Sequence, residues 1–231
     1  MGLFGQGVLE AFRLLLAGDR EVWQITWLSL QVSAGATALS LLVGIPLGAL
    51  LALSRFPGRA LAVSLVNTGM GLPPVVVGLF VTILLWRNGA LGALELLYTP
   101  TAMVVGQLVI AAPIVTGLTL AAVQQVPEAF RLQLLGLGAS RPQMTWVLLK
   151  EARLPMLAAV MAGFGGVISE VGASMMLGGN IKGSTRVLTT ATVLETGKGN
   201  FDVAIALSVI LLVITFLVNW ALSWIQQRRP A

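Results

Sequence analysis

The sequence predicts an all-α, polytopic membrane protein, and two observations carry that prediction. Of its 231 residues, 57% are hydrophobic and only 10% are charged, with a mean hydropathy of +0.92, which is typical of membrane proteins rather than soluble domains. Several apolar runs reach the roughly 20 residues that a helix needs to cross about 30 Å of hydrocarbon. The alternating pattern of membrane-spanning strands is missing from these runs, so we expect five spanning helices.

The first element is a segment too short to span the bilayer. The stretch 8-VLEAFRLLLAG-18 carries Glu10 and Arg13 among its apolar residues. Such a segment predicts an amphipathic helix that lies in the membrane interface. We place this helix within residues 1–22, ahead of a transmembrane domain at residues 23–229.

Five predicted spans follow, and an odd number places the two termini on opposite sides of the membrane. Cytoplasmic loops are enriched in Lys and Arg. Alternate loops divide the 14 basic residues eight to six, with Arg228 and Arg229 in the larger group. We therefore expect the N-terminus outside and the C-terminus in the cytoplasm. The predicted spans cover residues 24–54, 60–86, 100–124, 155–177 and 202–226.

The first span contains two glycines four residues apart, Gly44 and Gly48. Small residues at this spacing let two membrane helices approach closely. Five helices are few for enclosing a path through the membrane, so we expect two copies of the chain to form a homodimer about a two-fold axis.

The second span is interrupted by 67-NTGMGLPPVVVGL-79. Its two glycines loosen the helix, and its two prolines remove backbone donors before a new helix begins. Such a break is tolerated where it lines a cavity, and the positive N-terminal end of the new helix would favour an oxyanion. A simple proline kink that aids packing is the equal alternative. The candidate path residues here are Asn67, Gly69, Gly71, Pro73 and Pro74.

A polar segment at residues 125–155 separates the third and fourth spans. Pro127 suits the first turn of a short helix, which we expect to end at Gly136 and Gly138. Ser140 and Gln143 then have the spacing of a capping box that starts a second helix. Both helices are too amphipathic to span, so they predict a compact knob that projects into the cytoplasm. The alternative is a loop that merely joins two spans.

The fourth span ends near an acidic residue, Glu170, fifteen positions after Pro155. A carboxylate at membrane depth costs about 2.5–3.5 kcal/mol at the helix centre and less near an interface, so it should face partners or water. We therefore leave open whether Glu170 is a structural hydrogen-bonding residue or part of a path. It would repel an anion, which argues against direct binding of one. Ser174 and Asn180 are further path candidates in this region.

The composition also excludes several kinds of chemistry. The chain has no Cys and no His, which removes thiolate ligands and the commonest acid, base and metal ligand. No P-loop and no paired-carboxylate site at membrane depth occur, so we expect neither an enzyme nor a metal site. The net charge of +5 comes from loops beside apolar runs, where basic residues orient membrane helices, so we expect no nucleic-acid partner.

The polar segment has a counterpart in a known family. Gly138-Ala139-Ser140, followed after a helix by Leu154-Pro155, resembles the cytoplasmic loop of ABC importer permeases. In that family the loop docks into a groove of the ATP-hydrolysing subunit. The family's Glu-Ala-Ala positions hold Leu132, Gln133 and Leu134 here, so an acidic contact would come from elsewhere. The candidate coupling residues are Glu128, Arg131, Gly138, Ala139, Ser140, Arg141, Gln143, Lys150 and Pro155.

A second segment makes the resemblance more specific. Glu170-Val171-Gly172, Gly178-Gly179-Asn180-Ile181 and the run from Thr185 to Thr190 are similar to permeases for tungstate, molybdate and, more distantly, sulfate. The tungstate branch is the most similar. The resemblance implies a type I ABC importer permease core with five transmembrane helices, which imports a tetrahedral oxyanion by alternating access in a bacterial or archaeal cell (inner) membrane.

The same resemblance implies the partners. These are a second copy of the chain, a cytoplasmic ABC ATPase dimer that binds ATP and Mg, and an extracytoplasmic oxyanion-binding protein. The alternatives within the family are a molybdate or sulfate permease. Outside it, a passive anion channel or a secondary transporter would work without nucleotide, and a scaffold subunit would not transport at all.

Overall fold

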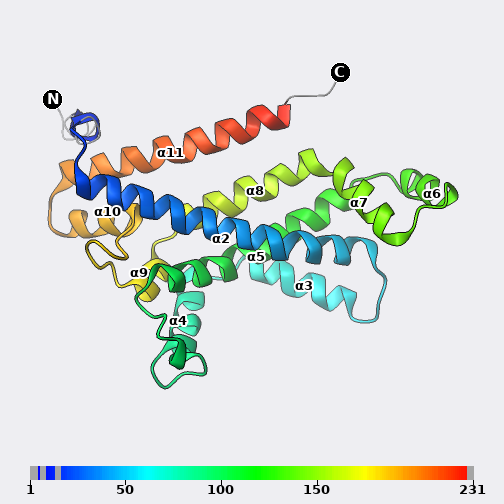
Figure 1. Ribbon diagram of the computed structural model, residues 1–231, viewed down its shortest axis with the longest axis horizontal. Coiled ribbons are helices and arrows are strands. Elements are labelled where there is room, and N and C mark those ends of the chain that lie inside the picture. Colours follow the sequence, from blue (N-terminus) through cyan, green and yellow to red (C-terminus); the bar gives the residue numbers. More distant parts are fainter. Residues whose placement is uncertain (1–4, 6–8, 14–16, 228–231) are drawn as a thin grey trace.

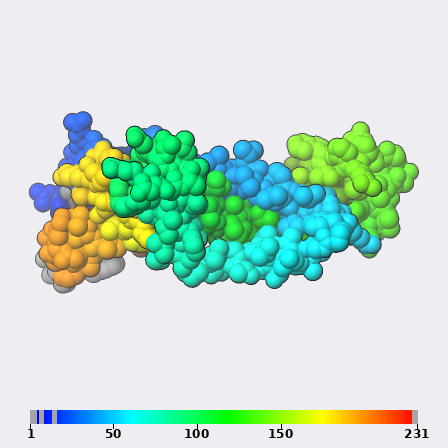
Figure 2. All heavy atoms as spheres, turned by 90° about the horizontal axis from the view of Figure 1, so that it is seen from below, coloured from blue at the N-terminus to red at the C-terminus, as the bar shows by residue number. Residues whose placement is uncertain are grey.

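The computed structural model describes residues 5, 9–13 and 17–227, and every regular element in these residues is a helix. This confirms the predicted all-α fold. Most helices run along one long axis (Figure 1). The helices α6 and α7 lie at one end of this axis, and α10 and the described N-terminal residues lie at the other. Figure 2 shows α3 and α4 (cyan to green) along one face, and the segment that contains α6 and α7 (yellow-green) projecting at one end.

Within the described residues, three helices are long and apolar enough to cross a membrane alone, and they coincide with three of the predicted spans: α2 (Arg20–Leu53), α5 (Pro100–Gln124) and α11 (Phe201–Gln227). The helix α2 begins four residues before the prediction. The carboxylate of Asp19 accepts a hydrogen bond from the backbone N–H of Val22 at 2.9 Å, so the cap extends the helix beyond its apolar run.

The second predicted span is broken, as its glycines and prolines suggested. It consists of α3 (Arg59–Met70) and α4 (Pro74–Leu85), which meet at an angle of 102°. The helix α4 therefore turns away from the long axis (Figure 1). A short 3-10 helix, η1 (Gly92–Leu94), lies in the loop that follows.

The prediction of one continuous helix over residues 155–177 is wrong. The structure has α8 (Arg153–Ile168) and α9 (Gly172–Gly178), bent by 58°. The break contains no proline, and the sequence analysis missed it for that reason. At Gly172 a Cβ would lie 2.7 Å from Cγ2 of Val75, so α9 starts where its backbone packs directly on α4. With each bent pair counted as one span, the described chain has up to five spans.

Besides η1 and the helical residues 9–13, the described residues contain the helices α6, α7 and α10 outside the spans. The polar segment forms α6 (Glu128–Gly136) and α7 (Arg141–Glu151), as predicted. The helix α10 (Leu188–Gly197) was not predicted. Its start is capped by Thr190, whose hydroxyl accepts from the N–H of Val187 at 3.1 Å.

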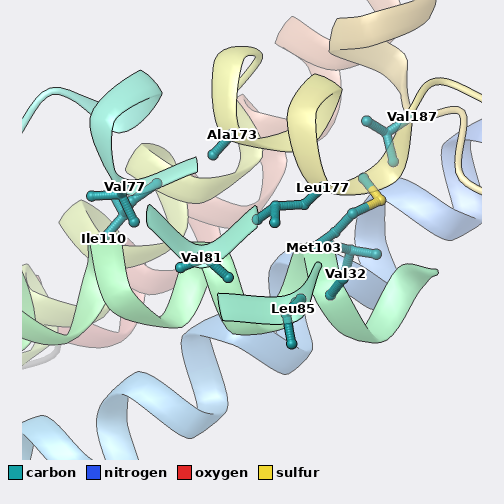
Figure 3. Close-up of a cluster of buried hydrophobic side chains, with 10 residues drawn as sticks. Val32, Val77, Val81, Leu85, Met103, Ile110, Ala173, Leu177 and Val187 are labelled. Atoms are coloured by element: carbon teal, nitrogen blue, oxygen red, sulfur yellow. The ribbon is translucent and has the colours of Figure 1, made fainter. Parts of the chain in front are cut away.

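The core is built around α5, which packs along α2. A Cβ at Gly48 would lie 2.6 Å from the carbonyl oxygen of Thr116, and one at Gly44 would lie 2.7 Å from Cγ1 of Val115. This confirms that the two glycines permit a close approach of helices. A cluster of buried side chains from α2, α4, α5 and α9 includes Val32, Val81, Met103 and Leu177 (Figure 3).

Part of the predicted N-terminal amphipathic helix is described. Residues 9–13 are helical, and Arg13 and Glu10 form an ion pair at 3.5 Å. Residues 20–22 belong to α2 instead. The rest of that predicted helix, residues 1–8 and 14–16 apart from residue 5, lies outside the described residues, as do Arg228 and Arg229.

Candidate functional site

The knob, which we define as residues 127–155, projects from one end of the molecule (Figure 1). No residue of α6 is buried, and in α7 only Met144 and Leu148 are. The outward side chains include large apolar ones, because Leu137 is 84% exposed and Trp146 is 71% exposed. The knob is therefore an apolar surface that the rest of the chain does not cover.

The turn between α6 and α7 is fixed by local hydrogen bonds. Gly138 has a φ of +79°, a left-handed conformation that favours glycine. The N–H groups of Gly138 and Ala139 donate to the carbonyls of Leu135 and Leu134, both at 3.0 Å, so the helix ends in a Schellman motif. The side-chain oxygen of Gln143 accepts from the Ser140 N–H at 2.8 Å and from its hydroxyl at 2.9 Å. One half of the predicted capping box is thus formed.

The candidate coupling residues do not all face outward. Arg131 is half-buried and its Nη2 donates to the carbonyl oxygen of Leu53 in α2 at 3.1 Å. Ala139 is half-buried as well. The exposed members of the set are Glu128, Gly138, Ser140, Arg141, Gln143, Lys150 and Pro155.

The second candidate region is the break between α3 and α4. No residue of α3 is buried, and Asn67, Gly71 and Pro73 are exposed. The carbonyl of Pro73 accepts from the N–H groups of the third and fourth residues after it, at 2.9 and 3.3 Å, and the two prolines offer no donor. Gly69 passes close to α5, since a Cβ there would lie 2.8 Å from the ring of Pro113. Irregular backbone at membrane depth needs protein or water beside it, not lipid.

Glu170 lies in the break between α8 and α9. Its Oε1 accepts from the N–H of Ala173 at 2.9 Å, and its carbonyl oxygen accepts from the hydroxyl of Thr189 at 2.9 Å. The side chain therefore caps α9 and replaces helical hydrogen bonds that the break removes. These hydrogen bonds fit the structural role that the sequence left open, and a part of Glu170 in a path stays a prediction.

The other two candidates of this region are tied into the protein. Ser174 is buried, and its hydroxyl accepts from Nε2 of Gln107 in α5 at 3.2 Å. Asn180 adopts a left-handed φ of +51° and donates to the carbonyl of Thr190 at 3.4 Å. Sequence reasoning missed Gln107, although it is an uncharged polar side chain in the middle of an apolar run. A small cavity beside it is lined by Ser29, Ser33, Glu170 and Thr189.

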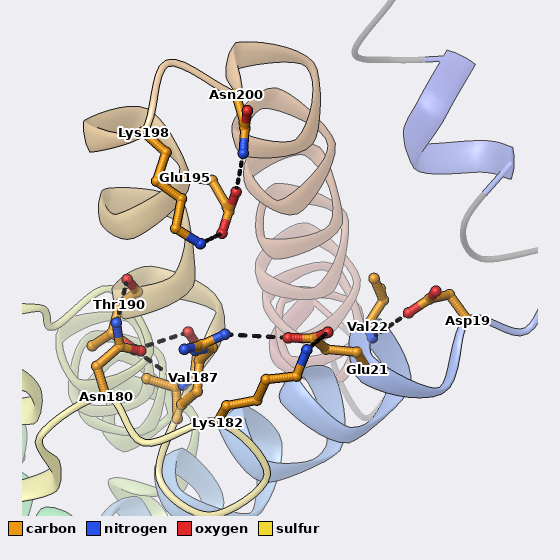
Figure 4. Close-up of polar contacts among 11 residues, drawn as sticks. Asp19, Glu21, Val22, Asn180, Lys182, Val187, Thr190, Glu195, Lys198 and Asn200 are labelled. Carbon is orange, nitrogen blue, oxygen red and sulfur yellow. Dashed lines mark hydrogen bonds and ion pairs between the residues drawn. The ribbon is translucent and has the colours of Figure 1, made fainter.

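A group of charges at the opposite end from the knob was also missed (Figure 4). Glu21, at the start of α2, pairs with Lys182 at 2.6 Å and with Arg186 at 3.2 Å. Nearby, hydrogen bonds from Asn200 and Lys198, both at 2.7 Å, hold the pKa of the Glu195 carboxyl below its usual range. The two ion pairs of Glu21 join α2 to the loop between α9 and α10. We call the loop of residues 179–187 the outer loop, after the side of the membrane on which the predicted orientation places it.

These charges and carboxylates do not form a metal centre, because no group of three or more His, Cys, Asp or Glu side chains gathers within the described residues. The arrangement instead combines spanning helices, two broken helices and an exposed knob.

Comparison with known proteins decides the family. The family model described as "Binding-protein-dependent transport system inner membrane component" matches residues 44–229, which is most of the chain. The chain belongs to this family. It is therefore the permease component of an ABC importer, and the family predicted from the sequence is confirmed.

The permease has close relatives among characterised proteins. The tungstate uptake system permease protein TupB of Peptoclostridium acidaminophilum is 38% identical over 229 residues, which cover 98% of this chain and 100% of that protein. A probable anion ABC transporter permease protein of Haloferax volcanii is 40% identical and covers 89% of this chain and 91% of that protein. More distant relatives, 28% or 26% identical, are named as molybdenum or sulfate transport permeases.

Solved structures confirm the permease fold. The MetNI methionine ABC transporter, in an inward-facing conformation, has a chain that matches with a TM-score of 0.72 at 21% identity. The match covers 93% of this chain and 97% of that chain. This likeness supports the fold, and the substrate has to be argued separately.

Proposed function

We propose that this permease imports tungstate by alternating access, as a homodimer bound to two ATPase subunits that carry ATP and Mg. The observation that carries the proposal is the knob, whose apolar surface projects beyond the spanning helices. Tungstate is proposed because a relative that is 38% identical over almost the whole chain is named a tungstate uptake permease.

The knob suits a protein partner better than lipid or water. A helix of 34 residues is about 51 Å long, more than the roughly 30 Å of hydrocarbon, so α2 extends beyond the membrane. The knob lies at the C-terminal end of α2. It exposes the apolar side chains of Leu137 and Trp146 and also the charged side chains of Arg141 and Lys150. Large apolar side chains that are rimmed by polar ones mark interaction sites. We propose an ATPase groove as their partner.

The break between α3 and α4 supports a path between two copies. Its exposed backbone at membrane depth favours contact with a second protomer or with water rather than with lipid. The N-terminal end of α4 carries a partial positive charge, which favours an oxyanion passing nearby. A binding protein on the outer side would deliver the anion, and the protein would lie in the cell (inner) membrane with its C-terminus in the cytoplasm.

The test is ATP hydrolysis and uptake by the permease, purified with its ATPase partner and placed in lipid vesicles. Binding protein is added with tungstate, molybdate or sulfate in turn. We expect tungstate-loaded protein to stimulate hydrolysis and nucleotide-dependent uptake the most. Stimulation by molybdate or sulfate alone would reassign the substrate. Uptake that needs neither nucleotide nor ATPase would instead identify a channel or secondary transporter.

A matched pair of variants tests the role of the knob in the same assay. Leu137→Ser removes an exposed apolar contact on the knob, whereas Leu212→Ser changes an equally apolar side chain that is 68% exposed on α11. Only a minority of interface residues cost more than about 1 kcal/mol when truncated, and these lie near the centre of the interface. We propose that Leu137 is one of them, so we expect Leu137→Ser to weaken ATPase binding about tenfold. Leu212→Ser should bind the ATPase normally, and equal binding by both variants would remove the knob from the interface.

A further inference from the structure

Arg131 differs from the other basic side chains of the knob. Arg141, Lys150 and Arg153 are exposed, whereas Arg131 is half-buried and reaches back to α2. Its Nη2 donates to the carbonyl oxygen of Leu53 at 3.1 Å, which joins residues 78 positions apart in the sequence. The guanidinium therefore contacts the membrane domain of its own chain.

The acceptor is a helix end that lacks its own cation. Leu53 is the last residue of α2, and the last four carbonyls of a helix have no partner within it. The last turn of α2 contains no basic residue. A second guanidinium reaches the same end from α3, since Nε of Arg59 donates to the carbonyl oxygen of Leu51 at 2.7 Å. Both cations lie at the negative end of the helix dipole, where they are favoured.

The other end of α2 is held as well. Glu21 pairs with Lys182 and Arg186 of the outer loop, at 2.6 and 3.2 Å (Figure 4). Between these ends α2 packs along α5 without space for a side chain at Gly48. One continuous helix, which contains Pro46 and packs along α5, thus connects the knob on one side to the outer loop on the other.

We propose that Arg131 is a positioning residue that ties the knob to α2, so that displacement of the knob by the ATPase moves α2 and, through Glu21, the outer loop. This inference rests on the proposed coupling function. Arg59 supplies the comparison, because it caps the same helix end from outside the knob. Loss of Arg59 removes a cap, whereas loss of Arg131 removes both a cap and the tie.

The experiment measures anion uptake per ATP hydrolysed by the full complex in vesicles, with tungstate-loaded binding protein. Mutations of residues that carry coupling between two sites weaken the coupling without abolishing it, so we expect Arg131→Leu to lower this ratio about threefold to tenfold. Arg131→Lys should recover part of the ratio, since an ammonium group also donates to a carbonyl. Arg59→Leu and Arg55→Leu, the latter changing an exposed cation of the preceding loop, should keep the wild-type ratio.

The outcomes distinguish the proposed link between the knob and α2 through Arg131, which we call the tie, from a capping role or a partner contact of Arg131. A wild-type ratio in Arg131→Leu would overturn the tie and leave the proposed function intact. Loss of ATPase binding in Arg131→Leu would overturn it too, because Arg131 would then contact the partner. An equal fall in Arg59→Leu would show that capping alone matters. Absence of nucleotide-dependent uptake in the wild type would overturn the proposed function, and the tie with it.

A chemical rescue keeps the proposal testable even if Arg131→Leu folds poorly. The chain contains no cysteine, so Ser54→Cys with Arg131→Cys provides the only two thiols. A short bifunctional thiol reagent would link the knob to the end of α2 in place of the hydrogen bond. We expect the linked complex to regain uptake per ATP relative to the unlinked one. A linked complex that stays uncoupled, or one that is inactivated by the link, would contradict the tie.

Discussion

Glu170 shows what residue identity alone does not decide. An acid at membrane depth must be compensated, and the sequence indicated that much. The carboxylate accepts from the backbone N–H of Ala173, and the backbone carbonyl of Glu170 accepts from the hydroxyl of Thr189. These hydrogen bonds form only because the helix breaks at this point. The break contains no proline, so the sequence gives no sign of it. The role of the side chain therefore follows from the backbone and not from its charge.

Glu170→Ala and Glu170→Gln give a prediction at this scale. Alanine removes the oxygen that caps α9, so we expect the free energy of unfolding to fall by about 1 kcal/mol. Glutamine keeps an acceptor oxygen and should lose less than half of that. The measurement is thermal unfolding of the purified chain in detergent, with Glu151→Ala, which changes an exposed acid on α7, as the control. Equal losses for alanine and glutamine would mean that the charge itself matters.

At the scale of elements, the sequence predicted the close packing of two helices better than it predicted where helices are broken. The spacing of Gly44 and Gly48 predicted a close helix contact, and the α2–α5 pair has one. Uninterrupted apolar runs gave α2, α5 and α11, and Pro73 with Pro74 indicated the first break. The second break and α10 escaped prediction, because they depend on tertiary contacts. Gly172 packs on Val75 of a distant segment, and the N–H of Leu188, at the start of α10, donates to the hydroxyl of Ser29 in α2 at 2.8 Å.

The α2–α5 contact supports a second prediction. Gly48→Ala would place a methyl group 2.6 Å from the backbone oxygen of Thr116, which cannot move away without shifting α5. Overpacking of this kind costs about 1–3 kcal/mol, and we expect a matching loss of thermal stability. Gly35→Ala on the same helix is the control, since its nearest neighbour would lie at 3.8 Å. Similar behaviour of the two variants would contradict the close contact.

At the scale of the whole molecule, the sequence predicted the class, the family and most spans, because hydropathy and loop motifs are local signals. It did not predict which side chains turn inward. Arg131 was grouped with the outward residues of the knob, and Glu21 with Arg186 was not recognised as a pair. Both contacts join segments far apart in the sequence, 78 positions in one case and 165 in the other. Spacing along the chain carries no information about them.

The proposed orientation can be tested directly, because the chain has no cysteine of its own. Single variants Ser184→Cys in the outer loop and Ala129→Cys in the knob place one thiol at each end, both at exposed positions. In right-side-out membrane vesicles we expect an impermeant thiol reagent to label Ser184→Cys at once. Ala129→Cys should react only after the vesicles are opened. The reverse pattern would invert the topology.

The two helix breaks also bear on how this chain can move. The helices α2 and α5 pack closely at Gly48, so we expect them to move together. Residues 71–73 and 169–171 lie between helices, and we expect each break to act as a hinge. The helices α4 and α9 lie beyond these breaks and pack on each other through Gly78 and Ala173. Rotation at one hinge should therefore carry the other with it, which would leave the permease a single principal degree of freedom instead of two.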